Sequence, residues 1–203
     1  MDFDAKAKEW DTDPVKRERA TAVAAAMRNR LRLSPDLSAL EYGCGTGLLS
    51  FALYRELGSI TLTDSSTGML AVLREKIEAS GAHHLRPVRL DLVIDPLPAE
   101  RYDLIYTLMT LHHVSDVERI LRDFHTLLRP EGVLCIADLD REDGSFHSAG
   151  FDGHPGFERE ELRSTLARAG FREIRFETCY VMRKPQGEEV REYPLFLAVA
   201  VRA

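Results

Sequence analysis

The stretch EYGCGTGLL, residues 41–49, places Gly43, Gly45 and Gly47 at alternate positions inside an otherwise apolar run. Glycine weakens both strands and helices, so three glycines in the middle of such a run need a specific cause. Three causes fit: a sharp turn, the close approach of a ligand to bare backbone, and tight packing of a helix on a strand. Because an apolar run precedes the glycines and a helical pattern follows them, the stretch predicts a strand, a ligand-binding loop and a helix.

The spacing of the glycines separates this loop from the common nucleotide-binding loops. A dinucleotide-binding loop reads G-x-G-x-x-G, whereas here the third glycine comes one position early and Leu48 occupies the slot for glycine or alanine. The spacing argues against NAD and FAD, and the alternative of a nicotinamide oxidoreductase predicts NAD(H) binding. A Walker loop is excluded because no Gly-Lys-Ser/Thr follows.

Short apolar runs alternate with helical patterns along the chain. Strands alternating with helices predict an α/β, Rossmann-like doubly wound fold with helices on both faces of the sheet. We expect a mostly parallel seven-stranded sheet with an antiparallel C-terminal strand, and ligands beyond the carboxyl ends of the strands. The expected strands are 38–42, 60–63, 87–90, 104–108 and 133–137, each followed by a helical segment, and a final antiparallel pair, 174–181 and 195–201, separated by a polar loop at 184–192.

The helix boundaries carry their own signals. Asp13-Pro14 supplies an N-cap oxygen and a proline at the first helical position, so it predicts a helix that Ser34-Pro35 stops. Glycines predict the ends of later helices, and a capping box predicts one start. These signals are Gly58 after 48–57, Gly81 after the helix through 70–79, Ser115 with Glu118 before 117–128, and Gly170 after 158–169.

Composition limits the class of protein. The 203 residues carry a net charge of −6, and no Pro- or Ser-rich linker divides them, so we expect a single domain. The acidic balance argues against a nucleic-acid partner. The start of the chain lacks an apolar signal-peptide region, no segment is long enough to span a membrane, and Cys44, Cys135 and Cys179 form no disulfide or metal spacing; these features predict a cytoplasmic protein.

One basic concentration interrupts the acidic composition. It runs from Lys16 to Arg32 and includes Arg17, Arg19, Arg28 and Arg30. We interpret it as the solvated face of the first helix.

The glycine loop and the motifs after it resemble those of the class I S-adenosylmethionine-dependent methyltransferases. Residues 41–47 match the first motif of that family, an acidic residue followed by glycines at alternate positions. DLIYTLMTLHHV, residues 103–114, matches the fourth-strand motif, and LLRPEGVLCIADLD, residues 127–140, matches the loop and fifth strand. The resemblance covers roughly residues 38–140 and implies S-adenosylmethionine as cofactor and S-adenosylhomocysteine as product.

The resemblance also implies roles for individual residues. Glu41 would reach the methionine end of the cofactor, Asp64 the ribose hydroxyls and Asp91 the adenine amino group, while Met69 would cover the adenine. A carboxylate at a strand end can accept two hydrogen bonds from a ribose. The implied cofactor-binding residues are Trp10, Glu41, Gly43, Gly45, Gly47, Asp64, Ser65, Met69, Asp91, Leu92 and Thr107.

Methyl transfer from a sulfonium chiefly needs alignment of the reacting atoms and exclusion of water. A general base is needed only when the acceptor carries a proton at neutral pH, and the candidates are His113 and His112, which follow the fourth strand. We expect residues 138–157 to form a substrate-facing insertion, and residues 1–35 to form a helical lid. Within the insertion, Asp138, His147 and His154 are the candidate substrate ligands, and with Asp140 they show no regular metal-ligand spacing, so no metal site is predicted.

The sequence therefore predicts a methyltransferase that acts on O, N, S or C of a small molecule, as a monomer or homodimer. A tRNA, RNA or protein methyltransferase is the enzymatic alternative. Against an amino-directed nucleic-acid enzyme, the motif of Asn or Asp, two prolines and an aromatic residue is absent, since residues 106–109 read Tyr-Thr-Leu-Met. An alternative of another class is a regulatory protein that binds S-adenosylmethionine without turnover.

Overall fold

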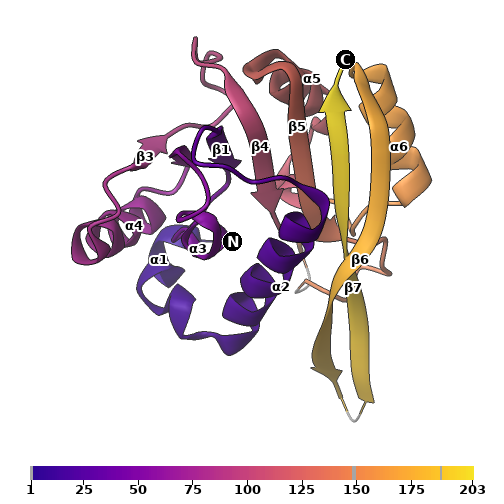
Figure 1. Cartoon of the computed structure of the whole chain (residues 1–203). Helices are drawn as coiled ribbons and strands as arrows, with labels where there is room; N and C mark the ends of the chain where they lie inside the picture. The colour runs from indigo at the N-terminus through magenta and orange to yellow at the C-terminus, as the bar shows by residue number, and fades with distance from the viewer. Residues whose placement is uncertain (1, 148–149, 188) are drawn as a thin grey trace.

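A seven-stranded sheet forms the centre of the molecule, with the strands in the order β3-β2-β1-β4-β5-β7-β6 (Figure 1). The computed structural model describes residues 2–147, 150–187 and 189–203. The strands are β1 (Ser38–Tyr42), β2 (Ser59–Asp64), β3 (Leu85–Arg89), β4 (Tyr102–Leu108), β5 (Leu128–Leu139), β6 (Phe171–Gln186) and β7 (Glu189–Arg202).

Neighbouring strands from β3 to β5 pair in parallel, and β7 pairs antiparallel with both β5 and β6. The order of strands reverses at β1, whose two neighbours are β2 and β4, so the loop after β1 opens at the switch point of the sheet. The predicted doubly wound, mostly parallel sheet with an antiparallel C-terminal strand is confirmed.

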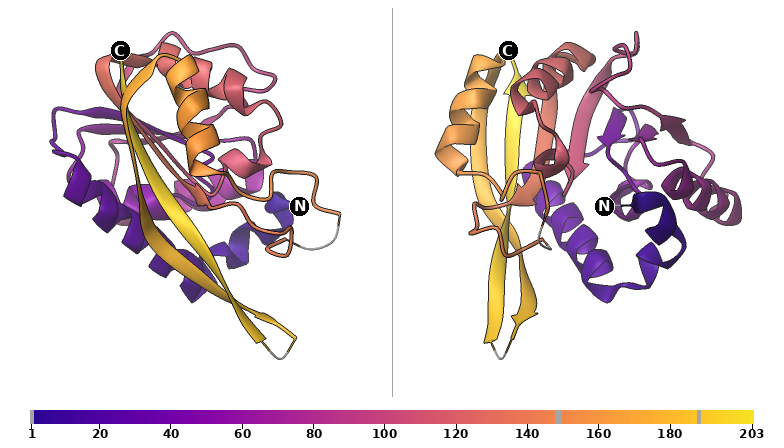
Figure 2. Two further views of the ribbon diagram at one scale, coloured as in Figure 1. Left: turned by 90° about the vertical axis from the view of Figure 1, so that its right-hand side faces the viewer. Right: turned by 180° about the vertical axis from the view of Figure 1, so that it is seen from behind.

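Helices cover both faces of the sheet, which gives the three layers seen in the two further views (Figure 2). The helices are α1 (Phe3–Lys6), η1 (Ala7–Thr12), α2 (Pro14–Arg30), α3 (Leu48–Leu53), α4 (Thr67–Ser80), η2 (Leu111–His113), α5 (Val117–Leu127) and α6 (Arg159–Arg168). No helix in the described part of the chain is both long and apolar enough to cross a membrane.

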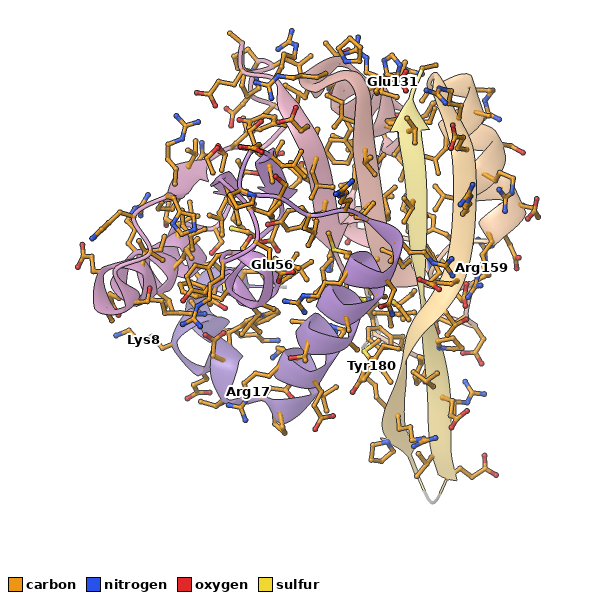
Figure 3. All side chains as sticks on the ribbon, viewed as in Figure 1. Lys8, Arg17, Glu56, Glu131, Arg159 and Tyr180 are labelled. Atoms are coloured by element: carbon orange, nitrogen blue, oxygen red, sulfur yellow. The ribbon has the colours of Figure 1, made fainter. Side chains whose placement is uncertain are left out.

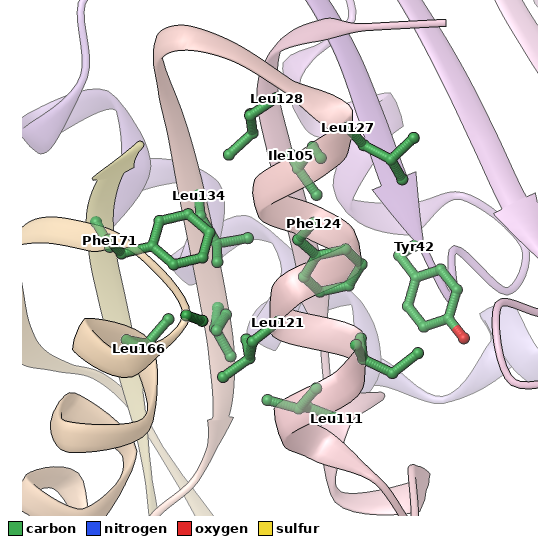
Figure 4. Close-up of a cluster of buried hydrophobic side chains, with 14 of the residues drawn as sticks. Tyr42, Ile105, Leu111, Leu121, Phe124, Leu127, Leu128, Leu134, Leu166 and Phe171 are labelled. Atoms are coloured by element: carbon green, nitrogen blue, oxygen red, sulfur yellow. The ribbon is translucent and has the colours of Figure 1, made fainter. Parts of the chain in front are cut away.

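Alternate residues of each strand enter opposite cores. On one face Leu40 and Ile105 pack against α5 and α6, where Phe124 is fully buried and stacks edge-on against Tyr42 (Figure 4). On the other face Ala39 and neighbouring strand residues pack against α2, α3 and α4. This period of two explains why the strand runs read as almost continuously apolar.

The last two strands differ from the prediction of a polar loop at 184–192. They form one long hairpin in which Lys184 pairs with Arg191 and Gln186 with Glu189, so most of the expected loop is strand. The hairpin extends past the edge of the sheet body, as Figure 1 shows. The outer half of the hairpin is exposed and polar on both sides. Its sequence therefore lacks the alternation of apolar and polar residues that marks a half-buried strand.

Three local predictions were wrong. Helix α3 ends at Leu53, so Gly58 is no cap; a Cβ at Gly58 would lie 2.0 Å from the carbonyl oxygen of Pro35, which is why glycine is needed there. The N-cap of α5 is Asp116, whose carboxylate accepts from the N–H of Arg119, instead of Ser115. No helix follows β3, because Pro96 and Pro98 keep residues 90–101 extended or in turns.

Other boundary signals were confirmed. Asp13 caps α2 with Pro14 at the first helical position, and Gly81 caps α4 in the left-handed conformation. Gly170, with φ of +98°, follows α6. Within the expected insertion at 138–157, the described residues 140–147 and 150–157 form no helix or strand, residues 148–149 lie outside the described part of the chain, and one isolated bridge joins Asp140 to Phe157.

Candidate functional site

A cavity of about 440 Å³ opens at the carboxyl ends of the parallel strands. Its volume falls in the range of small-molecule sites, roughly 300–1,000 Å³. The strand-end loops supply one part of its wall, the N-terminal helices a second part and the β6–β7 hairpin a third. The predicted site residues on the wall are Trp10, Glu41, Gly43, Gly45, Asp64, Ser65, Met69, Asp91, His112, His113 and His147.

The three glycines of the loop have three different neighbours. All have positive φ, but a Cβ at Gly43 would lie 2.2 Å from the side chain of Thr110, and one at Gly47 would lie 2.7 Å from Leu73. A Cβ at Gly45 would meet nothing closer than 3.8 Å, and its backbone faces the cavity between Trp10 and Met69. Gly45 is therefore the position that leaves the backbone open to a ligand, while Gly47 allows helix α3 to pack on α4 and β2.

The two strand-end aspartates lie on the same wall. Asp64 accepts hydrogen bonds from the N–H of Gly45 at 2.7 Å and of Ser66 at 2.8 Å, and burial raises its pKa despite these bonds. Asp91 accepts from the N–H of Val93 at 2.9 Å. Each carboxylate keeps a free lone pair on at least one oxygen, so both can accept hydroxyl or amino donors from a ligand.

Glu41 is the most buried acidic group of the cavity, with 2% of its surface exposed. It accepts a hydrogen bond from Ser50, whose hydroxyl is 2.5 Å from that of Tyr106. Burial raises the pKa of Glu41 to about 8, and the nearby Asp64 adds to the rise. A cation bound beside Glu41 would favour its ionised form, because opposite charges lower a carboxyl pKa.

The N-terminal segment, residues 2–13, is fastened across the cavity by two carboxylates. Asp4 accepts from the hydroxyl of Ser66 and, at 2.8 Å, from the N–H of Gly68 at the start of α4. Asp11 accepts from the hydroxyl of Thr46 in the glycine loop and from Lys76 at 2.6 Å. The segment brings Phe3, Lys6 and Trp10 onto the cavity wall, as a lid requires.

His112 and Asp138 form a buried hydrogen-bonded pair. The Nδ1 atom of His112 lies 2.6 Å from Oδ1 of Asp138, and the side chains are 1% and 0% exposed. Asp138 also accepts from the backbone N–H of His112 and of Leu139. The other ring nitrogen, Nε2, is buried without a partner in the described part of the chain, and His112 lines the cavity. With the proton on Nδ1, Nε2 is a free acceptor.

Asp138 does not line the cavity, so its predicted contact with substrate is corrected to a contact with His112. The carboxylate is wholly buried because the end of β5 lies behind the loop that carries the two histidines. It is therefore a positioning residue, which holds the imidazole in one orientation.

His113 and His147 lie beside His112, with ring centroids 4.2 Å and 5.0 Å from it. His113 packs edge-on against Phe3, and His147 stacks on Phe151. Burial, and the closeness of His112, lower the pKa of both side chains to about 4. Both rings are therefore neutral at pH 7.

Arg19, Met182 and Lys184 also lie on the wall and were not among the predicted site residues. Arg19 was interpreted as part of a solvated face, yet it falls four residues from Val15 and from Val23, on the stripe of α2 that faces the molecule. The position of a basic residue on an apolar stripe of the helix is the sequence signal that could have identified Arg19 as a site residue. Lys184 was missed because its segment was expected to be a loop.

Helix α2 lies along the start of the hairpin, which explains how distant residues meet. The hydroxyl of Tyr180 donates to Glu18 at 3.2 Å, and Figure 3 shows Tyr180 on the side of β6 that faces α2. At the next residue of α2, Nη1 of Arg19 lies 3.4 Å from the sulfur of Met182, two residues beyond Tyr180 on β6.

The remaining predicted site residues lie away from the cavity wall. Gly47, Leu92 and Thr107 pack in the interior, and the hydroxyl of Thr107 has no hydrogen-bond partner among the described residues. Nε2 of His154 lies 2.9 Å from the carbonyl oxygen of Val114, outside the cavity. Within residues 2–147, 150–187 and 189–203, no three His, Cys, Asp or Glu side chains are placed to hold a metal ion.

The wall fits S-adenosylmethionine chemically. An open glycine backbone at Gly45 and carboxylates at Glu41, Asp64 and Asp91 surround one cavity, and these are acceptors for an ammonium, two ribose hydroxyls and an adenine amino group. When bound, the cofactor supplies an electrophilic methyl group.

Comparison with known proteins also points to methyltransferases. Residues 40–136 match the family model of the methyltransferase domain. An uncharacterised methyltransferase of Schizosaccharomyces pombe is 30% identical over 118 residues, which are 55% of this chain and 42% of that protein. The ubiquinone biosynthesis O-methyltransferase of Pseudomonas paraeruginosa is 30% identical over 103 residues, or 50% of this chain and 44% of that protein. The chain thus spans less than half the length of these relatives.

The fold is shared with solved structures. A SAM-dependent methyltransferase from Aquifex aeolicus superposes with a TM-score of 0.73 at 21% identity, over 100% of both chains. The strand order, the position of the cavity at the strand ends and the domain match all agree with this fold. The chain is thus similar to methyltransferases over residues 40–136, and it has the fold of the class I S-adenosylmethionine-dependent enzymes.

Proposed function

We propose that this protein methylates a small molecule at an atom that carries a proton at neutral pH, a hydroxyl oxygen or an acidic carbon, and that His112 takes this proton. One observation carries the proposal: Nε2 of His112 is buried and unpartnered on the cavity wall while Asp138 holds Nδ1. A base held in this way is needed for a protonated acceptor and is superfluous for one with a free lone pair.

The balance of the reaction defines what His112 does. With the cofactor bound, the electron pair of the acceptor's O–H or C–H bond would form the new bond to the methyl carbon as the methyl–sulfur bond breaks, the electron pair of that bond would stay on the sulfur of S-adenosylhomocysteine, and the proton would move to Nε2 of His112. The charge on the resulting imidazolium is stabilised by the carboxylate of Asp138. The neutral rings of His113 and His147 and the ring of Phe3 exclude water around this nitrogen.

The size and the aromatic lining of the cavity support a small acceptor over RNA or protein. Phe3 and Trp10 line it from the N-terminal segment, and Phe146 lines it from the loop after β5. The Pseudomonas relative is named an O-methyltransferase, which agrees with a hydroxyl acceptor. A hydroxyl on a small molecule is therefore the first acceptor class to test.

The test compares His112→Gln with the unchanged protein on a panel of phenols and β-dicarbonyl compounds, with S-adenosylhomocysteine formation as the readout. We expect a loss of roughly 10²–10⁴ in kcat with unchanged affinity for S-adenosylhomocysteine. His113→Gln is the matched control and should keep most of the activity. Full activity of His112→Gln would contradict the role of His112. Binding of S-adenosylhomocysteine without turnover of any acceptor would support the regulatory alternative.

A further inference from the structure

Two cations face the end of the cavity where His112 lies, and neither forms an ion pair in the described part of the chain. Arg19 comes from α2 and Lys184 from β6, and both line the cavity. Among the described residues, the buried Nε atom of Arg19 has no hydrogen-bond partner, and the guanidinium donates only to the sulfur of Met182. The ammonium of Lys184 donates to the carbonyl oxygen of Phe146 at 2.8 Å and lies 3.5 Å above the ring of that residue.

No carboxylate near these cations forms an ion pair with either of them in the described part of the chain. Asp13 is engaged by Lys16 at 3.2 Å and by the N–H of Val15, and Asp138 is engaged by His112. Glu142 accepts from the N–H of Phe146 through one oxygen, its other oxygen is buried without a hydrogen-bond partner among the described residues, and it does not line the cavity. Asp13 and Glu142 favour the charged form of Lys184 from a distance, but a partly buried cation without a direct ion pair has lost hydration that is not fully replaced.

Contacts along β6 and the loop after β5 connect the two cations to His112. Nη1 of Arg19 lies 3.4 Å from the sulfur of Met182, which is two residues from Lys184 on β6. Lys184 lies 3.5 Å above the ring of Phe146, whose centroid is 4.8 Å from that of His147, and the His147 ring is 5.0 Å from that of His112. Burial and the neighbouring Arg19 lower the pKa of Lys184, which agrees with this placement. The cations therefore lie in the part of the cavity around His112.

We propose that the methyl acceptor carries an anionic group, a carboxylate or a phosphate, which binds between Arg19 and Lys184 while the reacting atom faces His112. This inference rests on the proposed function and narrows its substrate class. The planar guanidinium can donate two hydrogen bonds to one carboxylate or phosphate, and the ammonium adds a point charge from the adjacent strand β6. Phe146 and Met182 leave room for an apolar body between the anionic group and the reacting atom.

The test measures anion binding to the protein saturated with S-adenosylhomocysteine, by calorimetry. The probes are benzoate, inorganic phosphate and, as the neutral isostere, benzamide. We expect benzoate or phosphate to bind at millimolar concentration and benzamide not to bind. Binding of benzoate alone would assign a carboxylate, and binding of phosphate alone would assign a phosphate. Failure of both anions would overturn the inference.

Variants test the two cations directly. Arg19→Gln and Lys184→Gln should each weaken anion binding by about tenfold, since a charged hydrogen bond contributes about 1.5–3 kcal/mol. Arg19→Lys should restore part of the affinity. Lys16→Gln, on the same wall but already paired with Asp13, is the control and should change it less than about twofold.

The same titrations separate the inference from the proposed function. Affinity for S-adenosylhomocysteine should be equal in the unchanged protein and in Arg19→Gln, which also shows that the variant is folded. An equal fall in cofactor and anion affinity would overturn the inference, because Arg19 would then bind the cofactor's own carboxylate. A protein that fails to bind S-adenosylhomocysteine at all would contradict the proposed function instead.

Discussion

Asp138 at the end of β5 holds Nδ1 of His112 at 2.6 Å, across 26 residues of sequence. The contact links two neighbouring strand ends, since β4 leads into the loop with His112 and β5 ends at Leu139. Because Asp138 is bonded to the side chain and to the backbone N–H of His112, it fixes both the position and the tautomer of the ring.

Replacing Asp138 by asparagine should therefore lower kcat strongly without releasing the cofactor. The amide can present its NH₂ group to Nδ1, which would move the ring proton to Nε2 and remove the acceptor that faces the cavity. We expect a loss of about 10²-fold or more in kcat, little change in KM, and unchanged affinity for S-adenosylhomocysteine. Equal losses in stability and in cofactor affinity would instead indicate a structural role.

Binding of S-adenosylhomocysteine should release a proton from Glu41. Its pKa of about 8 means that the free protein holds this carboxyl protonated at pH 7, and an ammonium beside it would favour ionisation. Calorimetry in phosphate and in Tris, which differ in ionisation enthalpy, should report release of up to about one proton at pH 7 and progressively less above pH 8. Glu41→Gln is the control, and equal proton release in this variant would exclude Glu41 as the source.

Gly45 and Gly47 should respond differently to alanine. Both need positive φ, which costs an alanine about 1 kcal/mol. At Gly47 the methyl group would also clash with Leu73, so Gly47→Ala should lose about 2–4 kcal/mol of unfolding free energy. Gly45→Ala should lose less stability but weaken S-adenosylhomocysteine binding, because its methyl group projects into the cavity. Urea unfolding and calorimetry measure the two effects, and the reverse ranking would contradict the assignment.

Acid should destabilise the free protein through His113 and His147. Their folded pKa of about 4 lies below the ordinary value near 6.5, so the unfolded chain binds more protons between these values. The contribution of these two histidines to the unfolding free energy should therefore be constant above pH 6.5 and fall as the pH drops toward 4, whereas the raised pKa of Glu41 adds a separate, opposite slope between about 4.5 and 8. Urea denaturation at a series of pH values checks this. His147→Phe should flatten the slope, whereas a change at the exposed His83 should leave it unaltered.

Removing the hydrogen bonds of Asp4 that hold the N-terminal segment should accelerate cofactor dissociation. Asp4→Ala deletes the hydrogen bonds from Ser66 and Gly68 that hold the N-terminal segment over the cavity. Because Trp10 is the only tryptophan and lines the cavity, its fluorescence in stopped-flow displacement experiments reports the motion. We expect an off-rate increase of about 5–30-fold, because the N-terminal segment then opens more often. Glu9→Ala in the same segment should behave like the unchanged protein.

The cofactor side of the cavity could be predicted from the sequence because its determinants are local. A strand, a glycine loop and a helix follow one another within residues 38–53, and an acid after an apolar run marks a strand end. The positions of Glu41, Gly45, Asp64 and Asp91 on one wall follow from parallel strands ending at the same edge.

The other side could not be predicted in the same way because its contacts are distant in sequence. Arg19 meets Met182 across 163 residues, and Asp138 meets His112 only after β4 and β5 have paired. Local pattern shows that Arg19 lies on the inner stripe of α2, but it does not show that the hairpin lies opposite. The polarity of residues 184–192 concealed the strand that carries Lys184.

The wall of the cavity is thus encoded in two separate parts of the chain. The groups suited to the methyl donor come from Glu41 to Asp91, whereas the cations proposed for the acceptor come from α2 and from β6. Under this assignment, evolution or engineering can change the specificity for the acceptor without disturbing the binding of the methyl donor. Grafting a different hairpin, together with a substitution at Arg19, is then the shortest route to a methyltransferase with the same donor and a new acceptor.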